Sequence, residues 1–217
     1  MHNNHDKPER LTGNQNKETI VKICSQAFFQ DPLVTHFFQD DKRRAHQLNK
    51  FFSFLYKWVM KQGEIYAYPE NNPAGVCLLL PSSKYHPSFF QSVLNGAFGL
   101  VFSMKREELK RSDKVNKQMI KLHKEICPEV HQYLQVLAVS PESQGKGIGK
   151  ALLTFITEQA DKNQLPVYLE TLVESNARIY EKHGFRVEEI SSIPDTNLNI
   201  YSMLRKPSSV PMDYPLA

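Results

Sequence analysis

One stretch of the sequence decides the fold: residues 134–149 read LQVLAVSPESQGKGIG. Its first six residues are apolar apart from one glutamine, which is typical of a buried strand. A glycine-rich turn follows, and from about residue 147 to 162 apolar side chains recur at the spacing of one helix face. A strand, a glycine turn and a helix in this order predict a row of unpaired main-chain N–H groups where the helix begins.

An anion fits such a turn. The helix dipole adds partial positive charge to the free N–H groups, and glycines let a phosphate approach the backbone without meeting a Cβ. Lys146 and Lys150 add positive charge to the segment. The sequence therefore predicts a pyrophosphate site over residues 144–150, with a glycine turn that holds no ligand as the alternative.

Two other phosphate-binding motifs fit less well. A Walker A loop needs G-x-x-x-x-G-K-[ST], whereas Gly145 to Gly149 is one residue short and Ala151 replaces the hydroxyl. The dinucleotide fingerprint G-x-G-x-x-G follows its strand directly, whereas residues 140–144 separate the strand from the glycines here. An acidic residue at Glu170 keeps the dinucleotide alternative open, although the antiparallel hairpin expected after it argues against that alternative.

Periodicity predicts the remaining elements and indicates an α/β (α+β) protein. We expect a helix from residue 18 that Asp31-Pro32 ends, a short segment over 33–38, and a helix over 42–61 that stops at Gly63. Residues 88–126 are expected to be helical with a break near Ser103, and Asn176 is expected to cap a helix that runs to residue 183. Strands are expected over residues 64–68, 75–80, 133–139, 167–171, 185–190 and 198–204.

The length of 217 residues fits one domain, which we place at residues 17–206. Residues 1–16 are polar and are expected to form a flexible N-terminal tail. Residues 207–217 are rich in proline and are expected to form a C-terminal tail. No internal repeat or low-complexity segment is present.

Composition excludes several classes of protein. Apolar residues make up 41% and charged residues 23%, which is typical of a globular chain rather than a disordered one. The net charge is +4 and Lys and Arg are scattered, so no nucleic-acid partner is expected. The apolar stretch over 93–102 is shorter than the ~18 residues that cross a bilayer, so no membrane partner is expected.

The three cysteines, Cys24, Cys77 and Cys127, lie far apart and form no C-x-x-C pair. This spacing argues against a disulfide framework or a zinc site, and we expect no metal and a cytoplasmic location. Each cysteine is expected to be a small buried side chain rather than a nucleophile.

Two motifs resemble those of the GNAT acetyltransferases. Residues 144–149, QGKGIG, match the family motif Q/R-x-x-G-x-G/A, and residues 176–185, NARIYEKHGF, resemble its second motif. The resemblance is specific over residues 130–205. It is looser over 18–81, where FFQDP at 28–32 and GVCLLLP at 75–81 resemble the subgroup of puromycin-type N-acetyltransferases. Residues 82–126 carry no motif that can be placed.

The resemblance implies a GNAT fold, with a mixed, mostly antiparallel sheet that is splayed at two central strands and flanked by helices. It implies acetyl-CoA as co-substrate, bound by a core over residues 133–190, with the pantetheine arm between the splayed strands. The implied cofactor-binding residues are Leu137, Ala138, Val139, Gln144, Gly145, Lys146, Gly147, Ile148, Gly149, Lys150, Thr171, Asn176 and Tyr180.

The implied chemistry is attack of a neutral amine on the thioester by direct transfer in a ternary complex. A main-chain N–H near Ala138 would stabilise the oxyanion. Tyr180 stands at the family's tyrosine position and is expected to protonate the leaving thiolate, because a phenol with a pKa of about 10 stays protonated at neutral pH; packing on the cofactor is its alternative role. Glu170 is the first candidate for the base, and a solvated or capping carboxylate is its alternative; His131 and Glu142 are weaker candidates.

The acceptor side is expected from the first half of the chain. Phe28, Phe29, Phe37, Phe38 and Trp58 are candidates for an apolar acceptor pocket, with ordinary core packing as the alternative. Residues 82–126 would cover this side, which favours a small-molecule amine as the partner of a monomer or homodimer. A non-catalytic CoA-binding module and a protein N-acetyltransferase remain alternatives.

Overall fold

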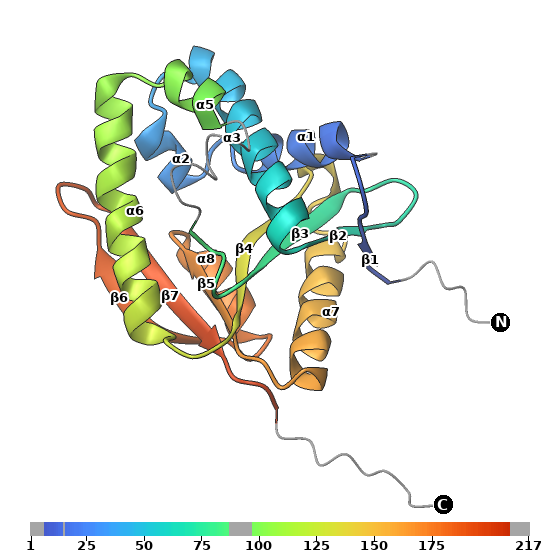
Figure 1. The fold of residues 1–217 in the computed structure, drawn as a ribbon. Coiled ribbons are helices and arrows are strands. Elements are labelled where there is room, and N and C mark those ends of the chain that lie inside the picture. Colours follow the sequence, from blue (N-terminus) through green and yellow to red (C-terminus); the bar gives the residue numbers. More distant parts are fainter. Residues whose placement is uncertain (1–6, 15, 87–96, 209–217) are drawn as a thin grey trace, which may run out of the picture.

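A mixed seven-stranded sheet forms the centre of the protein (Figure 1). The computed structural model describes residues 7–14, 16–86 and 97–208. The sheet has the order β1-β2-β3-β4-β5-β7-β6. Its strands are β1 (Glu9–Arg10), β2 (Glu64–Tyr68), β3 (Gly75–Pro81), β4 (Gln132–Val139), β5 (Val167–Thr171), β6 (Arg186–Ser192) and β7 (Asn199–Arg205).

The two central strands diverge soon after they meet. β4 and β5 are the parallel pair, and their register joins Gln132 to Val167 and Tyr133 to Tyr168. Every other neighbouring pair of strands in the sheet is antiparallel. The described structure thus confirms the expected mixed, mostly antiparallel sheet that is splayed at its centre.

Helices cover both faces of the sheet. On one face lie α1 (Lys17–Ala27), α2 (Pro32–Phe37), α3 (Asp41–Gln62), α5 (Ala97–Ser103) and α6 (Arg106–Ile126); on the other lie α7 (Ile148–Lys162) and α8 (Glu174–Glu181). Figure 1 shows α6 running beside β6 and β7, far from α7. Because helices cover both faces, the first six residues of β3 are all buried.

The segment after α1 differs from its prediction. Residues 33–38 were expected as a short segment without an assigned structure, and the structure forms helix α2 there, with Pro32 in its first turn. Asp31 caps this helix, since its carboxylate accepts from the N–H groups of Leu33 at 2.9 Å and Val34 at 3.3 Å. Asp31-Pro32 therefore begins a helix rather than ending one, and α1 already ends at Ala27.

The N-terminal tail is also shorter than predicted. Glu9 and Arg10 pair with β2 as an edge strand, because the next residue, Leu11, is buried and its N–H donates to the carbonyl of Ile65 at 2.8 Å. The predicted tail over 1–16 is therefore wrong for residues 9–11. Most of the predicted C-terminal tail, and residues 88–96 of the predicted helical segment, lie outside the described residues.

The cysteines occupy the positions that the sequence predicts. All three are buried, and burial raises the pKa of the Cys127 thiol to about 11. None of the helices in the described part of the chain is long and apolar enough to cross a membrane. In the same part of the chain, no group of three or more His, Cys, Asp or Glu side chains is arranged to hold a metal ion.

Candidate active site

A groove of about 490 Å³ opens where β4 leads into α7. Its lining brings together the end of β4, the glycine turn and the start of α7, which are consecutive in the sequence, with the more distant α8. Among the residues that line it are Leu137, Ala138, Val139, Gln144, Gly145, Gly147, Ile148, Gly149, Lys150, Asn176 and Tyr180. Most of the predicted cofactor-binding residues therefore lie along one groove.

The main-chain N–H groups at the start of α7 are free. The first amide of the helix with a main-chain acceptor is that of Ala151, which donates to the carbonyl of Gly147 at 2.9 Å. No described residue accepts a hydrogen bond from the amides of residues 145–150. These amides line a groove and are not occupied by the protein's own groups, so the residues present fit a diphosphate.

Two glycines make this arrangement possible. Gly145 and Gly147 have φ values of 76° and 83°, a left-handed conformation that side chains with a Cβ rarely adopt. A Cβ built on either residue would meet no heavy atom within 4 Å, so open space lies in front of both.

The polar side chains around the turn have different roles. Lys150 lines the groove, whereas the exposed Lys146 is not among its lining residues. The side chain of Gln144 turns back and donates to the carbonyl of Val139 at 3.3 Å. The structure therefore places Lys150 for charge and Gln144 for holding the turn against the strand.

The end of β4 carries a free edge. Beyond Tyr133, none of the described strands pairs with β4 on the side of β5. Its register with β3 shifts between Leu78 and Leu79, which leaves Gln135 as an additional residue, and such a bulge redirects the backbone. The main chain at Leu137 and Ala138 therefore faces no described partner strand on the side of β5.

A second cavity, of about 450 Å³, adjoins the first on the side of α2 and α6. The two share Phe28, Asp31, Leu137, Asn176 and Tyr180 in their linings. We refer to these cavities as the cofactor groove and the acceptor cavity, and to the five shared residues as the junction.

The predicted aromatic residues divide into two groups. Phe28, Phe37 and Phe38 line the acceptor cavity. Trp58 is a core residue whose indole N–H donates to the carbonyl of Lys84, and Phe29 packs on the core beneath the guanidinium of Arg44. Three of the five therefore line a cavity, and the acceptor role stays a prediction. Periodicity could not separate the two groups because all five lie on partly or fully buried helix faces or ends.

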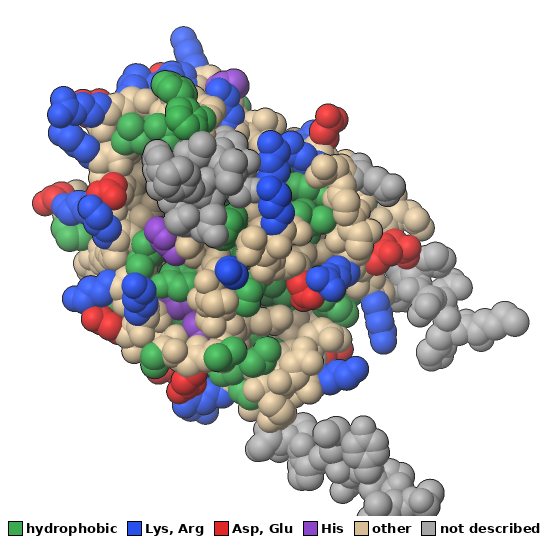
Figure 2. All heavy atoms as spheres, in the orientation of Figure 1, with side chains coloured by type: hydrophobic (Ala, Val, Ile, Leu, Met, Phe, Trp, Pro, Cys, Tyr) green, Lys and Arg blue, Asp and Glu red, His purple; other side chains and the backbone are tan. Residues whose placement is uncertain are grey.

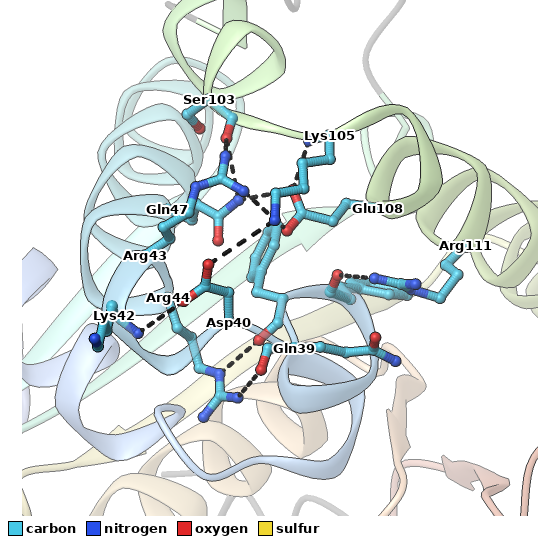
Figure 3. A network of polar contacts seen from close by, with 12 residues as sticks. Gln39, Asp40, Lys42, Arg43, Arg44, Gln47, Ser103, Lys105, Glu108 and Arg111 are labelled. Atoms are coloured by element: carbon cyan, nitrogen blue, oxygen red, sulfur yellow. Dashed lines mark hydrogen bonds and ion pairs between the residues drawn. The ribbon is translucent and has the colours of Figure 1, made fainter.

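Residues from the previously unplaced segment wall the acceptor cavity. Leu100, Met104, Leu109 and Met119 come from α5, α6 and the turn between them. Figure 3 shows the polar network that holds this wall on α3, and its centre is the buried Glu108. The Glu108 carboxylate accepts from the N–H of Lys105 at 2.6 Å and from the amide of Gln47 at 2.9 Å, and it forms an ion pair with Arg43 at 3.6 Å.

Glu108 corrects a further expectation from the sequence. Charged side chains dominate residues 105–117, which predicts a solvated helix face, but this carboxylate is only 3% exposed. In the same region Arg111 turns inward and donates to the carbonyl of Phe37 at 3.1 Å (Figure 3). On the face seen in Figure 2, the remaining Lys and Arg side chains are scattered among Asp and Glu, with no continuous basic surface.

Glu170 lies in the acceptor cavity at the end of β5. Its Oε2 accepts from the hydroxyl of Tyr133 at 2.7 Å. Burial raises the pKa of Glu170 to about 7, against the opposing effect of the hydroxyl of Tyr133. A carboxylate with a pKa near neutrality, in a cavity, has the properties of a general base.

Tyr180 lies at the junction, on the last turn of α8. Its ring packs edge-to-face on Phe185 at 5.8 Å between centroids. Burial, together with the negative charge of Asp31, raises the pKa of Tyr180 to about 12, so the phenol stays protonated at neutral pH. Both of its predicted roles, proton donor and packing surface, agree with this position.

Asn176 and Thr171 differ in detail from their predictions. Asn176 is the third residue of α8 rather than its cap, because the helix already begins at Glu174, whose carboxylate favours the first turn. It nevertheless lines the junction. Thr171 lines the acceptor cavity instead of the cofactor groove, and its Oγ1 accepts from the N–H of Val173 at 3.2 Å.

The weaker candidates for the base lie elsewhere. His131 is buried, with its Nε2 atom 2.6 Å from Nε2 of His123 and its Nδ1 atom 2.7 Å from the carbonyl of Glu129. Burial lowers the pKa of both imidazoles, that of His123 to about 3. Glu142 is exposed, and neither His131 nor Glu142 lines either cavity.

A splayed sheet, a helix start with free amides beside it and a second cavity at their meeting point form an arrangement suited to a ligand with a diphosphate and an extended arm. Residues 113–187, which contain the turn and α8, match the family model described as an acetyltransferase (GNAT) domain. The match covers about a third of the chain and supports a GNAT acetyltransferase domain there, and with it an enzyme that transfers acetyl groups. Enzymes of this family use acetyl-CoA.

Several solved structures share this fold. An acetyltransferase from Corynebacterium glutamicum, described as histone acetyltransferase HPA2 and related acetyltransferase, has 20% identity, 94% coverage of this chain, 99% coverage of its own and a TM-score of 0.61. Arylalkylamine N-acetyltransferase 2 from Aedes aegypti has 15% identity, coverage of 95% and 100%, and a TM-score of 0.57. The C-terminal condensation domain of Ebony, solved with β-alanyl-dopamine, has 7% identity, coverage of 92% and 98%, and a TM-score of 0.65.

At these identities the likeness establishes the fold. The placement in the puromycin-type subgroup is not supported by these comparisons and stays a prediction from the sequence.

Proposed function

We propose that this enzyme moves an acetyl group from acetyl-CoA to the primary amine of a small molecule, by direct transfer in a ternary complex. The observation that supports this proposal is the meeting of two cavities at the junction. One has free main-chain amides suited to a diphosphate, and the other contains a carboxylate with a pKa near neutrality.

Binding of acetyl-CoA is assigned to the groove residues. The amides of residues 145–150 would hold the diphosphate, with Lys150 adding charge from the groove wall. Leu137, Ala138 and Val139 would pair with the pantetheine arm along the free edge of β4, although the carbonyl of Val139 already accepts from Gln144. Asn176 would reach the arm from the side of α8. The thioester would then lie at the junction, beside Tyr180.

Glu170 would act on the amine. An ammonium has no lone pair with which to attack, so the acceptor must lose a proton before the new C–N bond forms. The Glu170 carboxylate opens into the acceptor cavity and has a pKa matched to this transfer, directly or through one water. Tyr133 would hold the carboxylate in place through its 2.7 Å hydrogen bond.

Tyr180 would act on the leaving group. As the C–S bond breaks, the thiolate takes a proton from the nearby phenol, and a main-chain N–H near Ala138 stabilises the oxyanion that precedes this step. A phenol with a pKa of about 12 is protonated throughout the neutral range. The buried thiols of Cys24, Cys77 and Cys127 line neither cavity, which agrees with transfer that forms no acetyl-cysteine.

The wall formed by α5 and α6 supports a small acceptor over a protein substrate. Leu100, Met104 and Leu109 close the acceptor cavity on the side away from the sheet, and the Glu108 network ties them to α3. An acceptor of limited volume fits this space better than an extended peptide does.

The test is turnover with a panel of amines against a panel of peptides. Purified protein with acetyl-CoA should release free CoA in the presence of small primary amines and not with peptides of equal amine concentration. Mass spectrometry of the protein after mixing with acetyl-CoA alone should show no added acetyl group. Peptide-dependent release alone would establish a protein acetyltransferase. Tight CoA binding without release for any acceptor would establish a binding module.

A further inference from the structure

The charged residues that line the acceptor cavity all have one sign. Among its described lining residues, Asp31, Asp113 and Glu170 are acidic, and Lys, Arg and His do not occur. A bound cation would meet favourable charge there, and a bound carboxylate would meet repulsion.

Asp31 has the position of a binding group rather than a purely structural one. One carboxylate oxygen, Oδ1, caps α2. The other makes no hydrogen bond or ion pair with the described residues, and the side chain lies at the junction, where the two cavities meet. Burial raises the pKa of Asp31, which indicates that its carboxylate has lost hydration that a bound ammonium would replace.

Most of the other lining residues are apolar. Aromatic and aliphatic side chains from several helices, their ends and the strands β4 and β5 form the walls, among them Phe28, Phe37, Phe51, Phe52, Leu100 and Met104, with a minority of neutral polar residues such as Asn116 and Gln135. Burying apolar surface of a ligand against such walls favours binding by about 25 cal/mol for each Å² removed from water. They offer few hydrogen-bond partners to a polar ligand.

From these observations we propose that Asp31 holds the ammonium group of the acceptor, and that the acceptor is an amine with an apolar body and no acidic group. This inference rests on the proposed function of the same site. Asp31 and Glu170 have separate tasks: Asp31 holds the cationic amine in the ground state, and Glu170 removes its proton for attack. Loss of Asp31 should therefore raise the KM for the amine, and loss of Glu170 should lower kcat.

A second side chain near the cavity, Arg111, could bind a carboxylate and would then overturn the proposed selectivity. Arg111 lies behind the wall at Phe37, and its Nε is buried without a hydrogen-bond partner among the described residues. If Arg111 turned into the cavity, an amine that carries a carboxylate would bind well. Selectivity between amines with and without a carboxylate distinguishes the two arrangements.

The experiment compares matched amines. Phenethylamine against phenylalanine, and hexylamine against 6-aminohexanoate, differ by a single carboxylate. We expect kcat/KM to be at least tenfold higher for the amine without the carboxylate in each pair. Equal values, or a preference for the carboxylated compounds, would overturn the proposal.

The variant Asp31→Asn tests the residue itself, with Asp40→Asn as the control. Asparagine also caps helices, so α2 should remain folded, which the melting temperature checks. We expect Asp31→Asn to raise the KM for hexylamine at least tenfold, with kcat within threefold and unchanged affinity for CoA. Asp40 caps α3 by accepting from the N–H of Lys42, as Asp31 caps α2, and it lines neither cavity, so its variant should change KM less than threefold.

A binding measurement keeps this test independent of turnover. Calorimetric titration of hexylamine and 6-aminohexanoate into the protein saturated with CoA reports affinity even when no acetyl group is transferred. Selective binding that Asp31→Asn abolishes, without turnover, would support the inference while the proposed function fails. Turnover that does not depend on Asp31 would support the proposed function and overturn the inference.

Discussion

At the residue scale, Tyr180 and Glu170 both line the acceptor cavity, the first from α8 and the second from the end of β5. Burial shifts the pKa of both groups upward, to about 12 and about 7. The same physical cause thus keeps the phenol able to donate a proton and brings the carboxylate to the pH at which it can accept one.

Replacing the phenol tests its role as proton donor. We predict that Tyr180→Phe lowers kcat by about 10²–10⁴-fold, the range expected for a positioned general acid, while the Kd for CoA stays within threefold. Stopped-flow or steady-state assays of CoA release measure the first quantity, and calorimetry measures the second. Tyr66→Phe is the matched control, because Tyr66 is partly buried beside α7 and donates to Glu64, away from both cavities. Equal losses in both variants would assign Tyr180 a packing role.

The pKa of Glu170 predicts how kcat depends on pH. Glu170 is the active base when ionised, so kcat should rise with pH and level off above a midpoint near 7. Glu170→Gln should remove this dependence and leave a low, flat rate, whereas Glu142→Gln, at an exposed position outside both cavities, should retain it. A midpoint that persists in Glu170→Gln would transfer the role of base to another group.

The same group predicts the sign of a stability change. Its pKa is raised from 4.5 to about 7 on folding, so the folded protein binds the proton more tightly than the unfolded chain. The contribution of Glu170 to stability is fully present below about pH 4.5 and is lost as the pH rises to 7. Urea denaturation at several pH values should show that the free energy of unfolding falls less steeply with rising pH in Glu170→Gln than in the unmodified protein.

At the element scale, the start of α7 depends on glycine. A side chain at Gly147 would cost roughly 1–2 kcal/mol because its φ is 83°, and its Cβ would occupy the space in front of the free amides. We predict that Gly147→Ala raises the Kd for CoA at least tenfold. Gly13→Ala is the matched control, since Gly13 has a φ of 70° and the same open surroundings but lies outside the groove. Both variants should lose similar stability, and only the first should lose affinity.

The wall over the acceptor cavity depends on Glu108. Removing its carboxylate leaves the amide of Gln47 and the N–H of Lys105 without their partner, and we predict that Glu108→Ala lowers the free energy of unfolding by about 1–3 kcal/mol. The neighbouring Glu107 is exposed, so Glu107→Ala should change the free energy of unfolding by less than about 0.5 kcal/mol. The KM for the amine should rise in Glu108→Ala only. Equal stability of the two variants would show that the network in Figure 3 contributes little.

The sequence predicted those elements whose signals are local. The strand β4, the glycine turn and α7 follow from one uninterrupted pattern, and the two family motifs located Tyr180 and Asn176. Asp31 was missed as a junction residue because its Asp-Pro signal marks the start of a helix as well as its end. The buried role of Glu108 was missed because its partners, Gln47 and Arg43, are distant in the sequence and only packing brings them together.

At the scale of the whole molecule, ligand binding should stabilise the folded chain. A ligand that binds the native state at 100 times its Kd adds about 2.7 kcal/mol, which for a domain of this size corresponds to a shift of several degrees. We predict that acetyl-CoA and CoA both raise the melting temperature, and that Gly147→Ala weakens the shift. Absence of a shift at millimolar CoA would contradict the assignment of the cofactor groove.

The two-residue contact between β4 and β5 has a mechanical consequence. Through the sheet itself, the half that contains β1 to β4 is joined to the half that contains β5 to β7 by very few hydrogen bonds. A pantetheine arm between β4 and β5 would form main-chain hydrogen bonds where the two strands do not pair with each other, and it would act as an eighth strand. Binding of the thioester would then make the sheet more rigid between β4 and β5. The same binding step would bring the reacting groups together, so the enzyme would be most rigid when its substrates are aligned for transfer.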